Sequence, residues 1–184
     1  MPFRKTAVNW TLAIGFFVGS YGINVLLLRD ALGIDPESNY SFLLFLPHGI
    51  RIFATYFIGF SAFFPLFLAQ YISFQLFPSA DNSIFVSLVA AICAPLAFEF
   101  FKQAKLNLYY TSGIADINSK ALILVGIIAS LINDIGTRFV ISSEAPEHFF
   151  SATFFLSYLL GDILGLIVCI VIFHLLINRI NANG

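Results

Sequence analysis

The sequence carries very little charge: only 10% of its 184 residues are Asp, Glu, Lys or Arg. Soluble domains typically carry about 25%, so this composition excludes a soluble globular domain. The net charge is −1, and no more than two basic residues are adjacent. Nucleic acid is therefore not expected as a partner, because binding it requires a basic surface.

Cysteine and histidine are also sparse, with two and three residues respectively. Cys93 and Cys169 fall within apolar runs, where a thiol behaves as a small hydrophobe, and the histidines are too scattered for a zinc site. The sequence contains no phosphate loop, no HExxH or CxxC motif and no serine–histidine–aspartate order. We therefore predict no enzymatic activity, no metal and no cofactor.

Hydrophobic residues make up 59% of the chain and form continuous runs of about the length of a membrane-spanning helix. A membrane β-barrel would instead alternate apolar and polar residues. We predict an all-α, polytopic membrane helical bundle that forms a single domain over residues 1–184. About six transmembrane helices are expected, at residues 7–28, 41–60, 62–77, 83–101, 121–140 and 150–177.

The distribution of basic residues predicts the orientation, because cytoplasmic loops are enriched in Lys and Arg. With a cytoplasmic amino terminus, only Arg29 and Arg138 lie outside. Six basic residues then lie inside: Arg4, Lys5, Lys102, Lys105, Lys120 and Arg179. Both termini are predicted to be cytoplasmic, and the lipid bilayer is the first expected partner.

The most unusual stretch is residues 46–51, Leu-Pro-His-Gly-Ile-Arg, which places two basic side chains in an apolar segment. Pro47 removes a backbone donor, and Gly49 permits close packing or an unwound turn. We predict that Pro47 kinks the second helix and that the segment lines a polar cavity. A tight turn or re-entrant arrangement is expected at residues 59–61.

Ionisable residues inside a membrane cost roughly 2.5 to 3.5 kcal/mol each and are functional-site candidates. Counting from the outer surface puts Arg51 and Asp162 at a similar depth of roughly 15 to 18 Å. We predict that they form a buried ion pair, with His48 one turn away on the same helix face. The pair is either a structural link between two helices or a site for an anionic or polar ligand.

Other polar residues form a secondary set. Asp134 and Arg138, four residues apart, are expected to pair near the outer end of the fifth helix. Glu99 is expected near the inner surface, close to Lys102. Glu99, Asp134 and Asp162 are predicted at three different depths, which leaves a proton relay open but does not require one.

Two motifs resemble a known family. Residues 46–51, together with residues 59–68, which begin with Gly59 and contain Pro65, resemble the W-P-P-A-G…G…W-P segment of the membrane-associated sensor domain of the first type, the MASE family. Residues 158–165, which include Gly161, Asp162 and Gly165, resemble its closing W-W-x-G-D-A-L-G helix. Glu99 falls where the family often has a glutamate. The family's tryptophans are replaced by Leu46 and Tyr158.

The resemblance implies a sensory input domain of the bacterial inner membrane, here stand-alone, shortened and without an output domain of its own. We therefore expect a sensor-like module that binds a small-molecule ligand, another membrane protein or a second copy of itself. Its cytoplasmic face would include residues 102–120. Two alternatives remain: the substrate-binding membrane subunit of a vitamin or metal importer, and a structural accessory subunit of a larger membrane complex, for which the 23 phenylalanines offer an apolar exterior.

Overall fold

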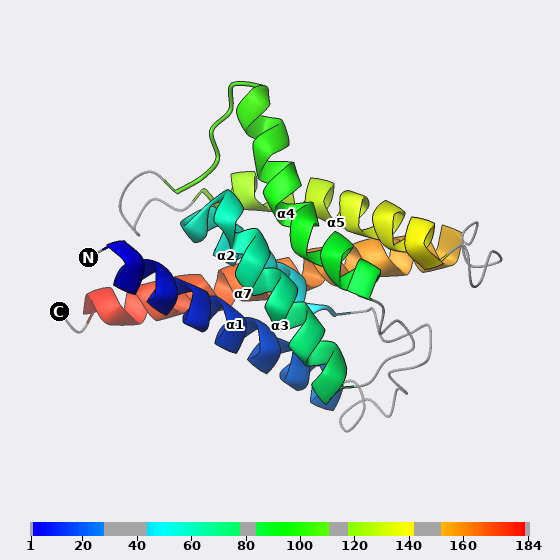
Figure 1. The fold of residues 1–184 in the computed structure, drawn as a ribbon. Helices are drawn as coiled ribbons and strands as arrows, with labels where there is room; N and C mark the ends of the chain where they lie inside the picture. Colours follow the sequence, from blue (N-terminus) through cyan, green and yellow to red (C-terminus); the bar gives the residue numbers. More distant parts are fainter. Residues whose placement is uncertain (1, 28–43, 78–83, 111–117, 142–151, 183–184) are drawn as a thin grey trace.

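The computed structural model describes residues 2–27, 44–77, 84–110, 118–141 and 152–182, and these residues form helices without strands. Figure 1 shows their arrangement. In chain order the elements are α1 (Pro2–Leu26), α2 (Leu46–Ile58), the 3₁₀ turn η2 (Phe60–Ala62), α3 (Phe63–Leu76), α4 (Ile84–Gln103), α5 (Ser119–Ile141) and α7 (Ala152–Ala182). The predicted all-helical class is confirmed.

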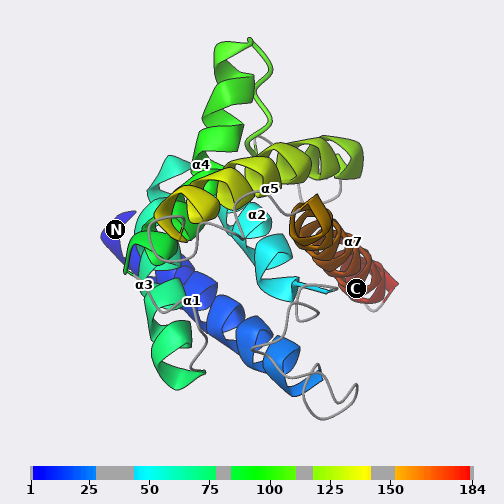
Figure 2. The same ribbon diagram turned by 90° about the vertical axis from the view of Figure 1, so that its right-hand side faces the viewer.

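The short helix α2 lies at the centre of the structure and contacts α1, α3, α4, α5 and α7 (Figure 2). Nine of its 13 residues are buried, among them His48 and Arg51. One apolar cluster packs around it with α4, α5 and α7, and a second with α1, α3 and α4. A helix enclosed on all sides is the element on which a buried polar site can be built.

The start of α2 corrects one prediction. Pro47 does not kink a longer helix; it occupies the first turn of a helix that begins at Leu46, after Phe45 with φ −119°. The first turn tolerates proline, because the backbone N–H that proline lacks would have no partner within the helix at that position. The tight turn expected at residues 59–61 is present: Gly59, with φ +80°, adopts a backbone conformation that favours glycine and leads into η2.

Close approach between α2 and α7 depends on glycines. The backbone N–H of Phe45 donates to the carbonyl oxygen of Gly161 at 3.0 Å. A Cβ atom on Gly49 would lie 2.7 Å from the Cβ of Cys169 and 3.0 Å from the carbonyl oxygen of Gly165, and one on Gly165 would collide with the backbone of Phe45. The absence of these side chains lets the two backbones touch, as small residues do between membrane helices.

Three described helices are long and apolar enough to cross a membrane, judged by length and composition: α4 over Ile84–Gln103, α5 over Ser119–Val140 and α7 over Phe155–Arg179. Helices α2 and α3, predicted as spans, have only 13 and 14 residues. A span needs about 20 residues, so neither reaches this length by itself. Residues 41–43 of the second predicted helix lie outside the described residues.

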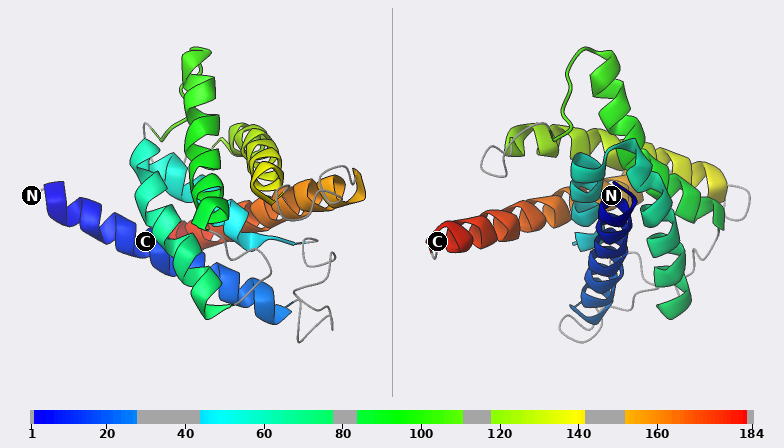
Figure 3. Two further views of the ribbon diagram at one scale, coloured as in Figure 1. Left: turned by 45° about the vertical axis from the view of Figure 1, so that its right-hand side comes forward. Right: turned by 60° about the vertical axis from the view of Figure 1, so that its left-hand side comes forward.

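The carboxyl-terminal part of α4 projects away from the other helices, as the two views of Figure 3 show. The chain then turns back at Lys105, which has φ +64°. The backbone N–H of Tyr110 donates to the carbonyl oxygen of Tyr56 at 3.1 Å, and the Tyr109 ring stacks on Phe98 with 4.9 Å between centroids. Residues 106–110 are thereby held against α4 and the end of α2.

Candidate functional site

Asp162 of α7 is fully buried and meets two polar side chains. The hydroxyl of Ser130 on α5 donates to its Oδ2 at 2.6 Å, and Nδ1 of His48 on α2 lies 3.3 Å from the same oxygen. The contact with His48 does not have the geometry of a hydrogen bond, and it is an ion pair only when His48 is protonated. Three helices therefore meet at one carboxylate.

The histidine ring is oriented by its other nitrogen. Nε2 of His48 lies 3.1 Å from the carbonyl oxygen of Gly126 on α5. A carbonyl oxygen only accepts hydrogen bonds, so Nε2 carries the proton in this contact. A Cβ on Gly126 would lie 3.7 Å from Nε2, which is ordinary contact, but it would collide with the side chain of Leu166 on α7. His48 thus presents Nδ1 to Asp162.

Arg51, 1% exposed, points toward other helices. Its guanidinium donates to Oε1 of Gln70 on α3 at 3.1 Å and to Sγ of Cys93 on α4 at 3.5 Å, and it lies 5.7 Å from the centre of the Phe17 ring of α1. All three contacts are with neutral groups. The predicted direct pair of Arg51 with Asp162 does not form in the described part of the chain.

The charges of Arg51 and Asp162 nevertheless act on the same neighbours, His48 and Cys93. The structure therefore brings the three predicted residues into one cluster but pairs the acid with His48. Within the described residues, His48 Nδ1, Arg51 Nε and Asp162 Oδ1 are each buried without a hydrogen-bond partner. Such atoms are uncommon in folded proteins, and each calls for an explanation.

A second group of polar side chains continues from Ser130 along one face of α5. Asn133, Asp134 and Thr137 are all buried on this face. Arg138 Nε donates to both carboxylate oxygens of Asp134 at 3.0 Å, and its guanidinium carbon lies 5.4 Å from the centre of the Phe155 ring of α7. Asp134, predicted near the outer end, is only 1% exposed, so this pair is mostly inside the protein.

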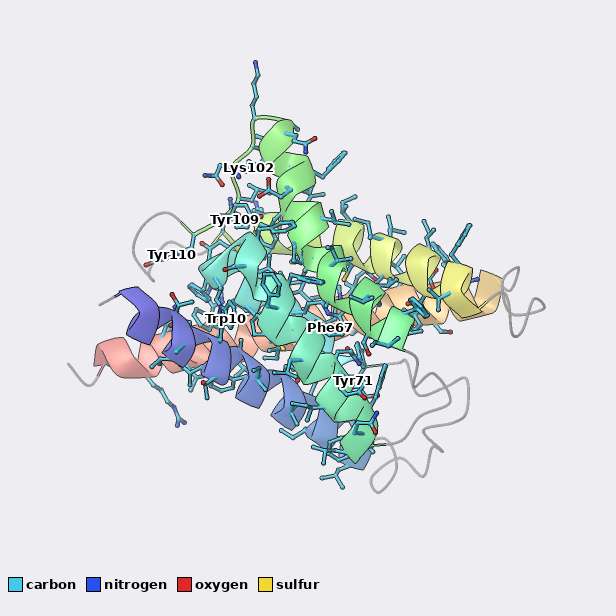
Figure 4. All side chains as sticks on the ribbon, in the orientation of Figure 1. Trp10, Phe67, Tyr71, Lys102, Tyr109 and Tyr110 are labelled. Atoms are coloured by element: carbon cyan, nitrogen blue, oxygen red, sulfur yellow. The ribbon has the colours of Figure 1, made fainter. Side chains whose placement is uncertain are left out.

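Glu99 belongs to a separate group at the projecting end of α4, where Figure 4 labels Lys102 and Tyr109. Lys102 Nζ donates to Glu99 Oε1 at 3.2 Å, and the Tyr109 hydroxyl donates to the same oxygen at 2.9 Å. Burial, helped by the hydrogen bond and charge of Glu99, raises the pKa of Tyr109 above its ordinary value. The side chains of Glu99 and Lys102 are 27% and 53% exposed, so solvent screens this group.

Sequence reasoning missed four members of the buried site: Gln70, Cys93, Ser130 and Asn133. A usable signal existed for the last two, because positions 126, 130, 133, 134 and 137 recur at helical spacing and share one face of α5. Among the residues that the structure covers, no three His, Cys, Asp or Glu side chains are grouped to hold a metal.

The fold and site together define a class: an all-helical protein with three candidate membrane-spanning helices and a charged cluster in its interior. Comparisons with protein-family models, with curated proteins and with solved structures gave no match for this chain.

Proposed function

We propose that the protein is a sensor-like module of the bacterial inner membrane that binds a small polar ligand between His48, Arg51 and Asp162. The observation that carries this proposal is that each of the three residues has one buried polar atom without a partner. A purely structural link would leave fewer such atoms, since an unsatisfied buried group costs about 1–3 kcal/mol.

The unpartnered atoms define what a ligand must offer. Arg51 Nε–H is a donor and Asp162 Oδ1 is an acceptor. A suitable ligand therefore has an acceptor for the guanidinium and a donor for the carboxylate. Arg51 also lacks a direct acidic partner among the described residues, which favours a ligand with negative charge near Nε.

The topology proposed with this function has about six spans and both termini in the cytoplasm. It is supported by the six-to-two split of basic residues. It is also supported by the positions of the N and C labels, which lie toward the same end of the molecule in Figure 1. The exposed face of residues 102–110 and the end of α7 would contact a partner membrane protein or a second copy.

The resemblance to the MASE family is part of the same proposal. Two of the three segments that carry it, residues 46–51 and 158–165, lie against each other: His48 contacts Asp162, and Phe45, just before the first segment, donates to Gly161. These two segments contribute His48, Arg51 and Asp162 to the buried cluster, which supports reading them as one functional unit.

Ligand binding is tested by thermal unfolding of the purified protein in mild detergent, with acetate, succinate, glycine and phosphate as probes. A ligand that binds only the folded state raises the melting temperature with its concentration. The shift should appear in the wild type and disappear in Arg51→Lys, which keeps the charge but removes Nε. Lys102→Ala is the matched control and should keep the shift. No shift in the wild type, or an equal shift in Arg51→Lys, would reject the proposal.

A transport subunit is the second candidate, and the polar face of α5 favours it, because polar residues inside a membrane bundle often mark substrate paths. It predicts uptake of a labelled vitamin that falls in Arg51→Ala. A sensor predicts no uptake and a changed output in a partner protein. A structural accessory subunit would instead co-purify in fixed stoichiometry, with Arg51→Ala affecting assembly alone.

A further inference from the structure

The buried face of α5 changes character halfway along the helix. Its first half buries only apolar residues: Leu122, Val125, Gly126 and Ala129. Its second half buries only polar ones: Ser130, Asn133, Asp134 and Thr137. Both halves lie in an apolar helix long enough to span a membrane. The residues of both halves are buried, so burial alone does not explain why one half is apolar and the other polar.

The polar half joins Asp162 to the end of the helix. At its inner end the hydroxyl of Ser130 donates to Asp162. At its outer end lies Arg138, whose side chain is 10% exposed. Arg138 follows Ser130 by eight positions, which correspond to about 12 Å of helix at 1.5 Å per residue and thus to a large part of half a bilayer.

Several polar atoms along this half have incomplete hydrogen bonding. Asn133 Oδ1 and Thr137 Oγ1 are buried without a partner in the described residues, as is Asp162 Oδ1 at the inner end. Buried water commonly satisfies such atoms and makes about three hydrogen bonds in doing so. The spacing of these atoms along one helix face matches a chain of water molecules rather than a single one.

The apolar half closes the route beyond Asp162. Leu122, Val125 and Ala129 of α5 pack with Leu166 and Ile170 of α7 in the apolar cluster around α2. No polar side chain of α5 is buried on this side within the described residues. Water that reaches Asp162 from Arg138 would therefore find no continuation toward the start of α5.

We propose that the polar half of α5 is a water-filled path, open at the Arg138 end and closed at the other, through which protons reach Asp162. The titratable groups that interact with Asp162 are His48 of α2, Cys93 of α4 and Asp134 of α5, and the charge of Arg51 acts on the first two of them. A proton that arrives is taken up by the group that Asp162 and His48 form, in which Oδ2 and Nδ1 lie 3.3 Å apart. The path does not depend on a ligand at Arg51 and could exist without one.

Cysteine accessibility tests the path in membrane vesicles of known orientation, with a small, charged, membrane-impermeant methanethiosulfonate. The cysteine thiolate attacks the reagent, forming a mixed disulfide and releasing methanesulfinate. The thiolate forms in water and is disfavoured in an apolar core, so a hydrated site should react about tenfold faster or more. Ser130→Cys and Ala129→Cys are a matched pair, since both positions are buried neighbours on one helix. Mass spectrometry locates the adduct, so Cys93 and Cys169 can remain in place.

The expected result is fast labelling at Ser130→Cys and Thr137→Cys from one side of the vesicle only, and slow labelling at Ala129→Cys and Val125→Cys. Equally slow labelling at all four positions would show a dry helix face and overturn the proposal. Labelling at Ser130→Cys from both sides would overturn the closed end.

A proton count provides a second readout that does not need cysteine variants. Protein in lipid nanodiscs is titrated with acid, and the protons taken up are compared between the wild type and Asp162→Asn. The wild type should bind one proton more, whereas Glu99→Gln, with its carboxylate outside the path, should leave the Asp162 step unchanged. Equal uptake in the wild type and Asp162→Asn would overturn proton delivery to Asp162. A failed ligand screen at Arg51 would leave both results unaffected.

Discussion

Two of the acid–base groups in the described residues differ chiefly in their surroundings. At the end of α4, Glu99 and Lys102 pair in partial contact with solvent. Between α2, α5 and α7, Asp162 and His48 pair with side chains only 1% exposed. The same kind of contact is worth little at the surface and carries a large desolvation cost inside. Of these two groups, only the buried one requires a reason for its presence other than keeping the surface soluble.

The largest predicted effect comes from Asp162→Ala. It leaves Arg51 and His48 without a nearby carboxylate in the interior, and removing one partner of a buried pair typically costs about 3–5 kcal/mol. The free energy of unfolding in mixed micelles with increasing dodecyl sulfate measures the loss. Asp162→Asn is the control and should lose less, because its amide oxygen still accepts from Ser130. A loss below that of Glu99→Ala would contradict the contrast between the two groups.

A smaller loss is expected for Ser130→Ala. The substitution removes the 2.6 Å hydrogen bond to Asp162, and a hydrogen bond to a charged group contributes about 1.5–3 kcal/mol. The same unfolding assay applies. In the double variant Ser130→Ala with Asp162→Ala, the two single losses should sum to more than the measured total, because both substitutions remove the same contact. Strict additivity would show that the bond contributes nothing.

Gly165→Ala should also destabilise the protein, by about 1–3 kcal/mol, because overpacking forces neighbouring atoms to shift. Its Cβ would meet the backbone of Phe45, just before the start of α2. Gly15→Ala is the matched control, since a Cβ there meets nothing within 4 Å and alanine is the better helix former. Equal melting temperatures for the two variants would argue against a tight contact between α2 and α7.

The smallest effect belongs to Glu99→Gln, which removes the charge from the exposed group. An exposed ion pair contributes at most about 1 kcal/mol and is screened by salt. We therefore expect a small change in the free energy of unfolding that shrinks further in high salt. The change for Asp162→Ala should be insensitive to salt, because that group is buried. A strong salt dependence at Asp162 would show that dissolved ions, and not water alone, reach it.

Much of the fold could be predicted from continuous apolar runs. The helical class and the helices α4, α5 and α7 follow from run length, since a long apolar segment with few charges has few other stable conformations. The role of Pro47 could not be predicted, because a proline within an apolar run fits both a kink and a first turn. The choice depends on where the helix begins. In the structure α2 begins at Leu46, and the preceding Phe45 bonds to Gly161 of α7.

The sequence predicted that His48, Arg51 and Asp162 belong to the candidate site. It did not predict which residues each of them contacts. Depth counting placed Arg51 and Asp162 at the same level, but it carries no information on which way each side chain points around its helix. Arg51 instead contacts α1, α3 and α4, and Asp162 contacts α2 and α5. Gln70 and Cys93 were missed for the same reason, because an amide or thiol in an apolar run has no local signal of its partner.

The sequence by itself determined that the chain is helical and apolar, with a few ionisable residues where hydrocarbon makes them expensive. Tertiary structure alone decided that His48 meets Asp162, that Arg51 meets neutral groups and that the polar half of α5 leads to the same carboxylate. The physical reason is that the free energy of a buried charge depends on its neighbours in space. In this protein the neighbours of the buried side chains of α2 come from the five other helices. Glycines permit the close backbone contact between α2 and α7.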